Sequence, residues 1–248
     1  MPLFLVNIGN THTQIAIMQD GEPLLLARYD TPKLIEDDGF VPLFEETTEP
    51  WRAVASSVVP RLMEKMAARY EGKIHFLAAQ DFPQLDFSLI DVRTVGMDRI
   101  ANAAAAIHLM DDGPAIVLDC GTCLVTEAID SQHHFRGGAI MPGRMLMRRG
   151  LADHTAQLPL IPIQHQRPSP LGTNTHDAIL AGIDLGAIGS VRQIIAETRQ
   201  ILNALECKVF ATGGDAPFFL ENIPELTPAP SLLTIRGIAT STPAMMKA

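Results

Sequence analysis

One stretch in the middle of the chain carries residue types that suit phosphate and metal chemistry. The apolar run Ala115–Leu118 predicts a buried strand, and it ends at Asp119. A carboxylate at a strand end can bind a hard cation. Gly121 lets the backbone turn and approach a ligand closely, and Thr122 adds a hydroxyl beside turn N–H groups that suit phosphate oxygens. A plain strand and turn with an exposed aspartate is the competing interpretation, because so short a motif is weakly specific.

A related pattern near the N-terminus favours the functional interpretation. The apolar run Leu3–Val6 is followed by a polar residue, a glycine and a threonine, in the segment Asn7, Ile8, Gly9, Asn10 and Thr11. More apolar or β-branched residues follow both copies, so each predicts a β-hairpin with a glycine-containing turn. Two such hairpins indicate a duplicated α/β unit with a ligand between its halves, and two phosphate-binding turns suit a nucleoside triphosphate.

A third stretch, Gly96–Arg99, precedes an alanine-rich helix that we expect to run to about Met110. An aspartate at a helix start is often only a cap, because the helix dipole favours negative charge there. The functional interpretation gives Asp98 a substrate hydroxyl to orient or deprotonate. Arg99 would then offer its planar fork to a substrate carboxylate, and Asn102 lies one turn further on a similar face.

Three further turns are notable, and the first and third of them are candidates for ligand contact. Phe135–Gly143 holds glycines and a proline that allow tight backbone geometry, with an interdomain turn as the alternative. Gly172–Thr175 predicts a turn and a helix N-cap at Thr175. The strand Lys208–Ala211 leads into Thr212–Asp215, whose Gly213 and Gly214 can lie against a nucleotide base or ribose, with a simple loop as the alternative. The helix after Gly143 carries positive charge that we interpret mainly as a solvated face, at Arg144, Arg148 and Arg149.

The order of elements predicts an α/β fold. Strand patterns alternate with the amphipathic helix Arg61–Tyr70, as they do in α/β proteins. Asp111–Pro114 forms a turn, and we place the boundary there, between an N-terminal domain of residues 1–112 and a C-terminal domain of residues 113–248.

The composition excludes several classes of protein. A net charge of −9 argues against general nucleic-acid binding, which normally needs a basic face. We find no apolar run that is long enough to span a bilayer and no secretory signal, so we expect a cytoplasmic protein. The three cysteines include one C-x-x-C at Cys120 and Cys123, which we interpret as small residues in a reducing compartment, with a redox pair as the minor alternative.

Taken together, these motifs resemble one family closely, the type III pantothenate kinases of the sugar kinase/Hsp70/actin superfamily. The matching segments occur in order from residue 6 to about residue 238, so nearly the whole chain is covered. Each segment is weakly specific alone, but the ordered set is specific. The segments are Ile8–Thr11, Gly96–Arg99 with Asn102, Asp119–Thr122, Gly137–Gly143, Leu151–Pro159, Gly172–Thr175 and Thr212–Asp215.

The resemblance implies two ribonuclease H-like, actin-like ATPase domains with a cleft between them, in a homodimer. It implies transfer of the ATP γ-phosphoryl group to pantothenate, the first step of coenzyme A biosynthesis, with Mg²⁺ and a monovalent cation, K⁺ or NH₄⁺. Asp98 would be the catalytic residue. The substrate would contact Gly96, Met97, Asp98, Arg99 and Thr175. ATP would contact Asn7, Ile8, Gly9, Asn10, Thr11, Gly121, Thr122, Gly213 and Gly214. Asp119 would bind the monovalent cation or Mg²⁺.

One departure from the family pattern bears on activity. The family's first motif begins with aspartate where this chain has Asn7, so the Mg²⁺ site loses a negative charge. That loss corresponds to a few kcal/mol, or roughly two orders of magnitude in rate. Two hypotheses follow: a pantothenate kinase, or a catalytically impaired homologue that acts as a ligand-binding or regulatory protein. A kinase for another small hydroxy acid is a third.

Overall fold

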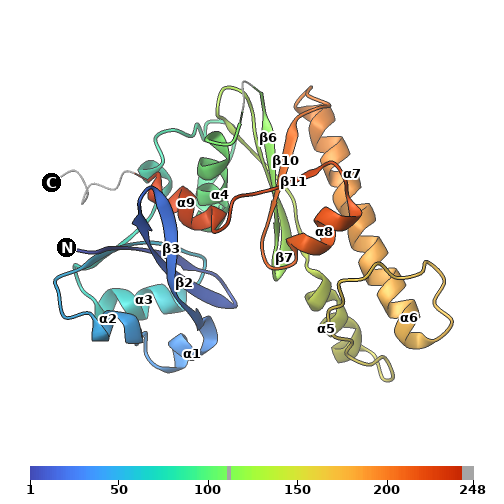
Figure 1. Cartoon of the computed structure of the whole chain (residues 1–248), viewed down its shortest axis with the longest axis horizontal. Coiled ribbons are helices and arrows are strands. Elements are labelled where there is room, and N and C mark those ends of the chain that lie inside the picture. Colours follow the sequence, from blue (N-terminus) through green and yellow to red (C-terminus); the bar gives the residue numbers. More distant parts are fainter. Residues whose placement is uncertain (111–112, 242–248) are drawn as a thin grey trace. The chain divides into compact units, whose positions relative to one another are not determined.

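The computed structural model describes residues 1–110 and 113–241, which form two compact units (Figure 1). The first unit comprises Met1–Leu109 and the segment that begins at Leu232, and the second comprises Met110–Ser231. Asp111 and Asp112, where we expected a boundary turn, lie outside the described residues. The sequence division placed everything after residue 112 in one domain, whereas the structure groups the last helix with the first unit.

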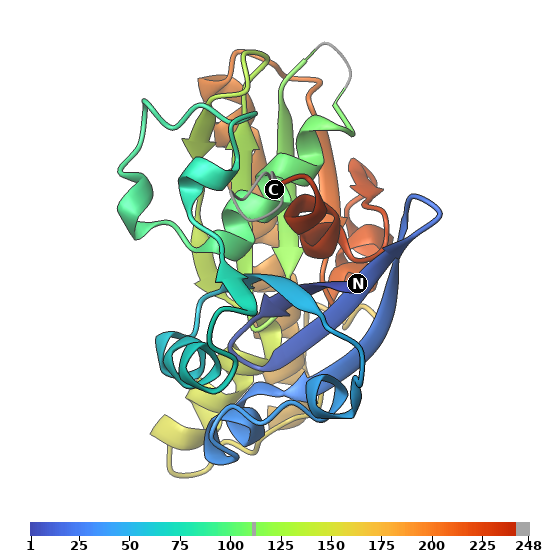
Figure 2. The same ribbon diagram turned by 90° about the vertical axis from the view of Figure 1, so that its left-hand side faces the viewer.

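The first unit is built on a mixed five-stranded sheet (Figure 2). Its strand order is β3-β2-β1-β4-β5, with antiparallel pairing on the β2 side of β1 and parallel pairing on the β4 side. The strands are β1 (Leu3–Ile8), β2 (His12–Gln19), β3 (Glu22–Asp30), β4 (Arg52–Ser57) and β5 (Ile74–Phe76). The helices are α1 (Thr31–Glu36), α2 (Pro42–Glu46), α3 (Pro60–Arg69), α4 (Met97–Ile107) and α9 (Leu233–Ala239), with 3₁₀ turns at Ala79–Asp81 and Val92–Thr94.

Alternation along β1 assigns its side chains to two faces of this sheet. Phe4, Val6 and Ile8 join the buried core that α1, α2 and α3 cover. Trp51, the single tryptophan, packs in that core within an aromatic cluster. Leu5 and Asn7 therefore lie on the opposite face, and the helices α4 and α9 pack on β1 and β4.

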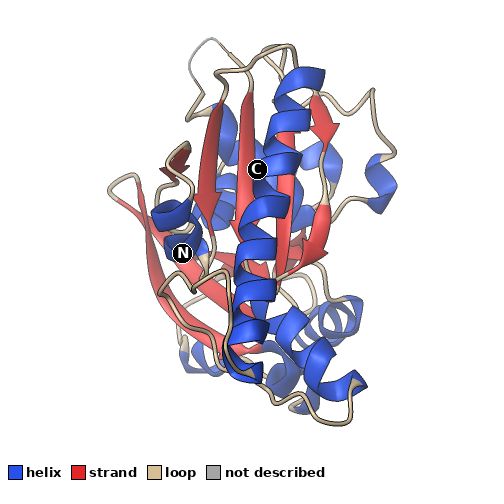
Figure 3. Cartoon of the chain, turned by 90° about the vertical axis from the view of Figure 1, so that its right-hand side faces the viewer, coloured by secondary structure: helices blue, strands red, loops and turns tan. Residues whose placement is uncertain are grey.

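The second unit repeats this plan (Figure 3). Its sheet has the order β11-β10-β6-β7-β8, and β9 also pairs with β7. The strands are β6 (Ala115–Cys120), β7 (Cys123–Ile129), β8 (Phe135–Gly137), β9 (Ile140–Pro142), β10 (Lys208–Thr212) and β11 (Leu226–Pro228). The helices are α5 (Arg144–His154), α6 (Thr175–Leu180), a π-helical turn at Ala181–Leu185, α7 (Gly186–Ile201) and α8 (Ala216–Asn222). The long α7 packs through Ala187, Ile188, Val191 and Ile195 into the core of this unit.

The two sheets have equivalent central strands, which confirms the predicted duplication. β1 pairs antiparallel with β2 and parallel with β4, and β6 pairs antiparallel with β7 and parallel with β10. The predicted class, α/β with two ribonuclease H-like units, is therefore correct.

The helical run Thr175–Ile201 is continuous, because the π-helical turn joins α6 to α7. The run is also long and apolar enough for a membrane span by length and composition, with a mean hydropathy of 1.5, so the prediction of no such run was wrong. A core helix passes the same test, and α7 is packed as one, so this is weak evidence for a membrane.

Candidate functional site

The two predicted phosphate turns are hairpin turns, and in each a glycine N–H donates a hydrogen bond to the start of the second strand. Gly9 N–H donates to the carbonyl of His12 at 3.1 Å, and Gly121 N–H donates to the carbonyl of Cys123 at 2.9 Å. Each turn directly follows the central strand of its sheet. Asn10, Thr11, Gly121 and Thr122 are exposed. Both turns therefore present small or polar residues where a phosphate could bind their N–H and hydroxyl groups.

Asn7 places a buried amide oxygen on the α4 and α9 face of the first sheet. Its parallel register partner on β4 is Ser56. Asn7 Oδ1 and Ser56 Oγ are both buried, and neither has a hydrogen-bond partner among residues 1–110 and 113–241. Buried polar atoms are normally paired, so an orphaned amide oxygen is one sign of a ligand or ion site.

The start of α4 carries the candidate catalytic carboxylate. Asp98 is half-buried in the first turn of the helix, and its Oδ1 accepts the Arg99 N–H at 2.7 Å. Burial raises the pKa of the Asp98 carboxyl above its usual 3.8, although hydrogen bonding to Arg99 N–H and the Arg99 charge oppose that shift. A carboxylate with a raised pKa is better matched to accept a proton near neutral pH.

Position 96 has little room for a side chain, because Asp98 packs against Gly96. A Cβ at Gly96 would lie 2.6 Å from Asp98 Oδ1 and 3.0 Å from Val58 Cγ1. Beside it is a hollow of about 280 Å³ lined in part by Ser57, Val58, Gly96 and Met97. Of the predicted substrate residues, Gly96 and Met97 line this hollow, whereas Asp98 and Arg99 are not among its lining residues.

Asn102 makes a structural contact that its helical spacing did not predict. Its side chain is buried, and its Oδ1 accepts the Thr234 hydroxyl at 2.8 Å. It therefore ties α4 to α9 inside the first unit. Sequence spacing could not reveal this contact because Thr234 is 132 residues away along the chain.

In the second unit, two glycine segments pack directly on the turn that follows β6. Gly143 N–H donates to the Thr122 carbonyl at 2.9 Å, and a Cβ at Gly143 would lie 2.4 Å from the Gly121 carbonyl oxygen. Gly213 has a positive φ of 92°, and a Cβ there would lie 2.4 Å from the Cys120 carbonyl oxygen and 2.6 Å from Asp119 Oδ1. The structure therefore joins Asp119, Gly121 and Thr122 to the Gly213–Gly214 segment.

Thr175 is exposed at the first position of α6, but it is not the cap that we predicted. The N-cap is Asn174, whose Oδ1 accepts the Asp177 N–H at 3.0 Å. Gly172 packs on this first turn, because a Cβ there would lie 2.2 Å from the Ala178 nitrogen.

The remaining chemical alternatives find little support. Within the described residues, no three His, Cys, Asp or Glu side chains gather as a metal cluster. Cys120 and Cys123 are free thiols, and burial raises the pKa of the Cys120 thiol, which opposes thiolate chemistry. The redox interpretation of this C-x-x-C is therefore disfavoured.

Comparison with known proteins decides the family. The family described as type III pantothenate kinase matches residues 3–197. The chain belongs to the type III pantothenate kinase family. A type III pantothenate kinase from Chlorobaculum parvum is 32% identical over 249 residues, which cover 94% of this chain and 91% of that protein. The chain is accordingly a kinase, and the family supports pantothenate and ATP as its substrates.

Solved structures agree on the fold. A putative Baf family transcriptional activator from Campylobacter jejuni has a TM-score of 0.62 at 20% identity, covering 95% of each chain. A putative N-acetylmannosamine kinase from Listeria monocytogenes has a TM-score of 0.55 at 12% identity, covering 97% of this chain and 98% of that one. Ta0583, an archaeal actin homologue, has a TM-score of 0.50 at 11% identity over both whole chains. These likenesses identify the fold of sugar kinases and actin-like ATPases.

Two arginines of this kinase were misread from the sequence. We interpreted Arg144, Arg148 and Arg149 mainly as a solvated helix face, but Arg144 is 1% exposed and Arg148 is fully buried. Only Arg149 of the three is exposed. The position of Arg144 could have indicated its burial. A cation at the first position of a helix is opposed by the helix dipole, so it needs a partner from another element.

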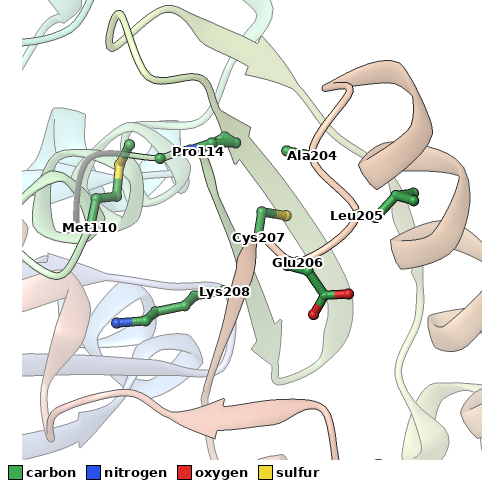
Figure 4. Close-up of a pocket in the computed structure, with 8 residues that line it drawn as sticks. Met110, Pro114, Ala204, Leu205, Glu206, Cys207 and Lys208 are labelled. Atoms are coloured by element: carbon green, nitrogen blue, oxygen red, sulfur yellow. The ribbon is translucent and has the colours of Figure 1, made fainter.

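A larger hollow of about 390 Å³ lies elsewhere on the kinase. It is lined by Met110, Gly113, Pro114 and the segment 204–208, at the beginnings of β6 and β10 (Figure 4). The candidate phosphate turn follows the end of β6, at the opposite end of the strand. Size alone therefore does not identify the nucleotide site.

Proposed function

We propose that this kinase transfers the γ-phosphoryl group of ATP to the terminal hydroxyl of pantothenate. The product is 4′-phosphopantothenate, and the reaction is the first step of coenzyme A biosynthesis. The observation that carries the proposal is the family match, together with the repetition of a glycine hairpin turn after the central strand of both sheets. Phosphoryl transfer depends mainly on positioning and charge neutralisation, which suits turns rich in N–H and hydroxyl groups.

Asp98 orients or deprotonates the acceptor hydroxyl in this proposal. Its support is the half-buried position in the first turn of α4 and the raised pKa of its carboxyl. The pantothenate carboxylate would be bound by the Arg99 guanidinium, whose planar fork suits such a group. Gly96, Met97 and Thr175 complete the proposed acceptor contacts.

The nucleotide contacts are proposed for both units. The phosphates would be bound by the main-chain and hydroxyl groups of Asn7, Ile8, Gly9, Asn10, Thr11, Gly121 and Thr122. The Gly213–Gly214 segment would lie near adenine, and its packing on the β6 turn supports that assignment.

Each unit offers an oxygen ligand of the kind that suits a hard divalent cation. Asp119 offers a half-buried carboxylate, and Asn7 offers an orphaned buried amide oxygen. Mg²⁺ accepts one or two protein oxygens together with water and substrate phosphates. When bound, it would neutralise charge on the β- and γ-phosphates, and we propose that Asp119 also serves a monovalent cation, K⁺ or NH₄⁺.

Asn7 also supports a second candidate function. An amide oxygen carries no negative charge, so it binds Mg²⁺ more weakly than the family's aspartate would. The second candidate is therefore a catalytically impaired homologue that binds nucleotide or pantothenate-like ligands. A kinase for another small hydroxy acid predicts turnover with a different acceptor.

The deciding experiment measures ATP- and Mg²⁺-dependent phosphorylation of pantothenate by the natural chain and by Asn7→Asp. We expect turnover by the natural chain and an increase in kcat of roughly ten- to a hundredfold for Asn7→Asp, equivalent to about 1.4–2.8 kcal/mol. Asn203→Asp is the matched control, because Asn203 is exposed just after α7, outside the proposed contacts, and its substitution adds the same charge. No turnover by the natural chain, with a large gain for Asn7→Asp, supports the impaired homologue.

A thermal measurement separates metal binding from activity. A new carboxylate in a buried position is costly without a counter-charge. Asn7→Asp should therefore lower the melting temperature in EDTA, and Mg²⁺ with ATP should raise it more than in the natural chain. An equal rise in both proteins would contradict a metal site at Asn7.

We further propose a cytoplasmic homodimer, on the strength of the family resemblance. A sedimentation mass of twice 26.9 kDa would support the dimer, and a mass of 26.9 kDa would contradict it.

A further inference from the structure

A buried ion-pair network lies directly behind the proposed nucleotide segment in the second unit. Arg144 is 1% exposed and binds Asp215 through both arms of its guanidinium, with Nε donating to Oδ2 at 2.7 Å and Nη2 donating to Oδ1 at 2.5 Å. Its Nη1 donates to the Gln164 carbonyl at 3.0 Å and lies 3.2 Å from Asp184 Oδ1. The guanidinium carbon lies 3.5 Å from the centre of the Phe218 ring. All three guanidinium nitrogens are thus engaged, as a buried arginine requires.

The network closes a ring of contacts around the β6 turn. Gly143, the residue before Arg144, donates its N–H to the Thr122 carbonyl. Asp215 donates its own N–H to the Cys120 carbonyl at 2.9 Å. The Arg144–Asp215 pair joins these two anchors, so the turn, the start of α5 and the end of the Gly213–Gly214 segment are linked to one another.

The pair with Asp215 explains why an arginine occupies the start of α5, whereas the helix itself does not. A cation at a helix N-terminus is disfavoured by the helix dipole. Burial also opposes the charged guanidinium, yet the hydrogen bonds and charge of Asp215 outweigh it and raise the Arg144 pKa. The Gly213–Gly214 segment is exposed and glycine-rich, so its backbone has few restraints of its own.

We propose that Arg144 is a positioning residue for nucleotide binding, because its bidentate pair with Asp215 holds the Gly213–Gly214 segment against the phosphate turn. The inference rests on the proposed function, since it takes this turn and segment as the nucleotide site. Arg144 does not touch substrate, and it acts through Asp215. Its effect is therefore on the affinity for ATP rather than on the affinity for pantothenate.

The test compares Arg144→Lys and Asp215→Asn with the natural chain. Lysine retains the charge but not the planar fork, and asparagine retains the shape but not the charge. We expect the Kd for ATP, measured by calorimetry with Mg²⁺ present, to rise about tenfold in each variant. The KM for pantothenate should stay within twofold. Hydrogen exchange of residues 213–216 should become faster in the ATP-free protein.

Two neighbours on α5 provide matched controls. Arg148 is equally buried and pairs with Asp184 at 2.8 Å, so Arg148→Gln reports the cost of disturbing a buried ion pair on the same helix. Arg149 is exposed, so Arg149→Gln reports loss of charge alone. Neither control should change the Kd for ATP more than twofold, although Arg148→Gln should lower the melting temperature.

Several outcomes would overturn the inference. It is wrong if folded Asp215→Asn binds ATP within twofold of the natural chain, or if Arg148→Gln weakens ATP binding as much as Arg144→Lys does. If Arg144→Lys fails to fold, the ATP affinity of Asp215→Asn tests the inference. The Asp215 side chain is partly accessible, and this substitution removes only one charge. A natural chain that neither binds ATP nor phosphorylates pantothenate would overturn the proposed function as well.

Discussion

At the scale of single residues, environment decides what a side chain can do. Asp98 and the exposed acids of the same unit are chemically alike, but burial raises the pKa of Asp98 while hydrogen bonds from Arg93 and Lys65 lower those of Asp91 and Asp38. Because folded Asp98 holds its proton more tightly than the unfolded chain does, stability falls as pH rises above the usual 3.8 and through the raised pKa. A charged Asp98 therefore costs stability at neutral pH.

Asp98→Asn tests whether the charged carboxylate that costs stability is also required for activity. We expect kcat to fall at least about a hundredfold, the lower end for losing a general base. The melting temperature at pH 7 should be equal to or higher than that of the natural chain, because the buried charge is gone. That advantage should vanish below pH 3.8, where both states of the natural Asp98 are protonated.

The measurements are steady-state kinetics and thermal unfolding at several pH values, with Glu64→Gln on the exposed face of α3 as the charge control. An unchanged kcat would remove Asp98 from its catalytic role. The raised pKa would be contradicted if Asp98→Asn, compared with the natural chain, were less stable at pH 7 than at pH 3.

At the scale of elements, close backbone packing fixes which helices flank the site. α9 packs on α4, and a Cβ at Gly237 would lie 1.8 Å from the Ala101 carbonyl oxygen. The Thr234–Asn102 hydrogen bond lies in the same contact. Since α4 carries Asp98 in its first turn, the seating of α9 also supports the position of the proposed catalytic group.

Gly237→Ala should disturb this contact. The clashing atom belongs to the backbone, which cannot swing aside, so we expect a loss of about 2–3 kcal/mol in the free energy of unfolding. Urea unfolding followed by Trp51 fluorescence measures it, because Trp51 is buried in the same unit.

Gly189→Ala is the control for that experiment. It lies in α7 with open space around the added methyl group, so helix propensity should stabilise it by about 0.5–1 kcal/mol. Circular dichroism is suitable for this variant. Equal stability of Gly237→Ala and the natural chain would show that α4 and α9 are not tightly seated.

At the scale of the whole molecule, the chain builds one unit, then a second, and returns to complete the first. The helix α9 contributes Leu233, Ile235 and Ile238 as buried apolar residues, and it contacts β1 and β4 as well as α4. The first unit therefore depends on residues from both ends of the chain.

A truncation after Ser231 tests this dependence. It should expose the apolar faces of α4 and β1, so peptides from β1 and β4 should lose protection from hydrogen exchange. Peptides from β6 and β10 should keep theirs, because the core of the second unit lies within 110–231. The natural chain, measured under the same conditions, is the reference for both sets. Retained protection in β1 and β4 without α9 would contradict the assignment.

The sequence by itself determined the local features of this kinase. The hairpins at Asn7–Thr11 and Asp119–Thr122 were predictable because apolar runs, glycines and β-branched residues act over a few neighbouring positions. The ordered motif set identified the family, and the comparisons agree. The amphipathic pattern of α3 likewise predicted its buried face, which includes Leu62 and Met66.

Only the tertiary structure decided which distant groups meet. Arg144 looked like part of a solvated face, yet its partners Asp215 and Asp184 come from segments 71 and 40 residues further along the chain. The boundary at residue 112 separated α9 from the first unit for the same reason, and the contact of Asn102 with Thr234 was likewise not predictable. Spacing along one helix reports which residues share a face, but it does not report what covers that face, because burial and ion pairing arise only when separate elements pack together.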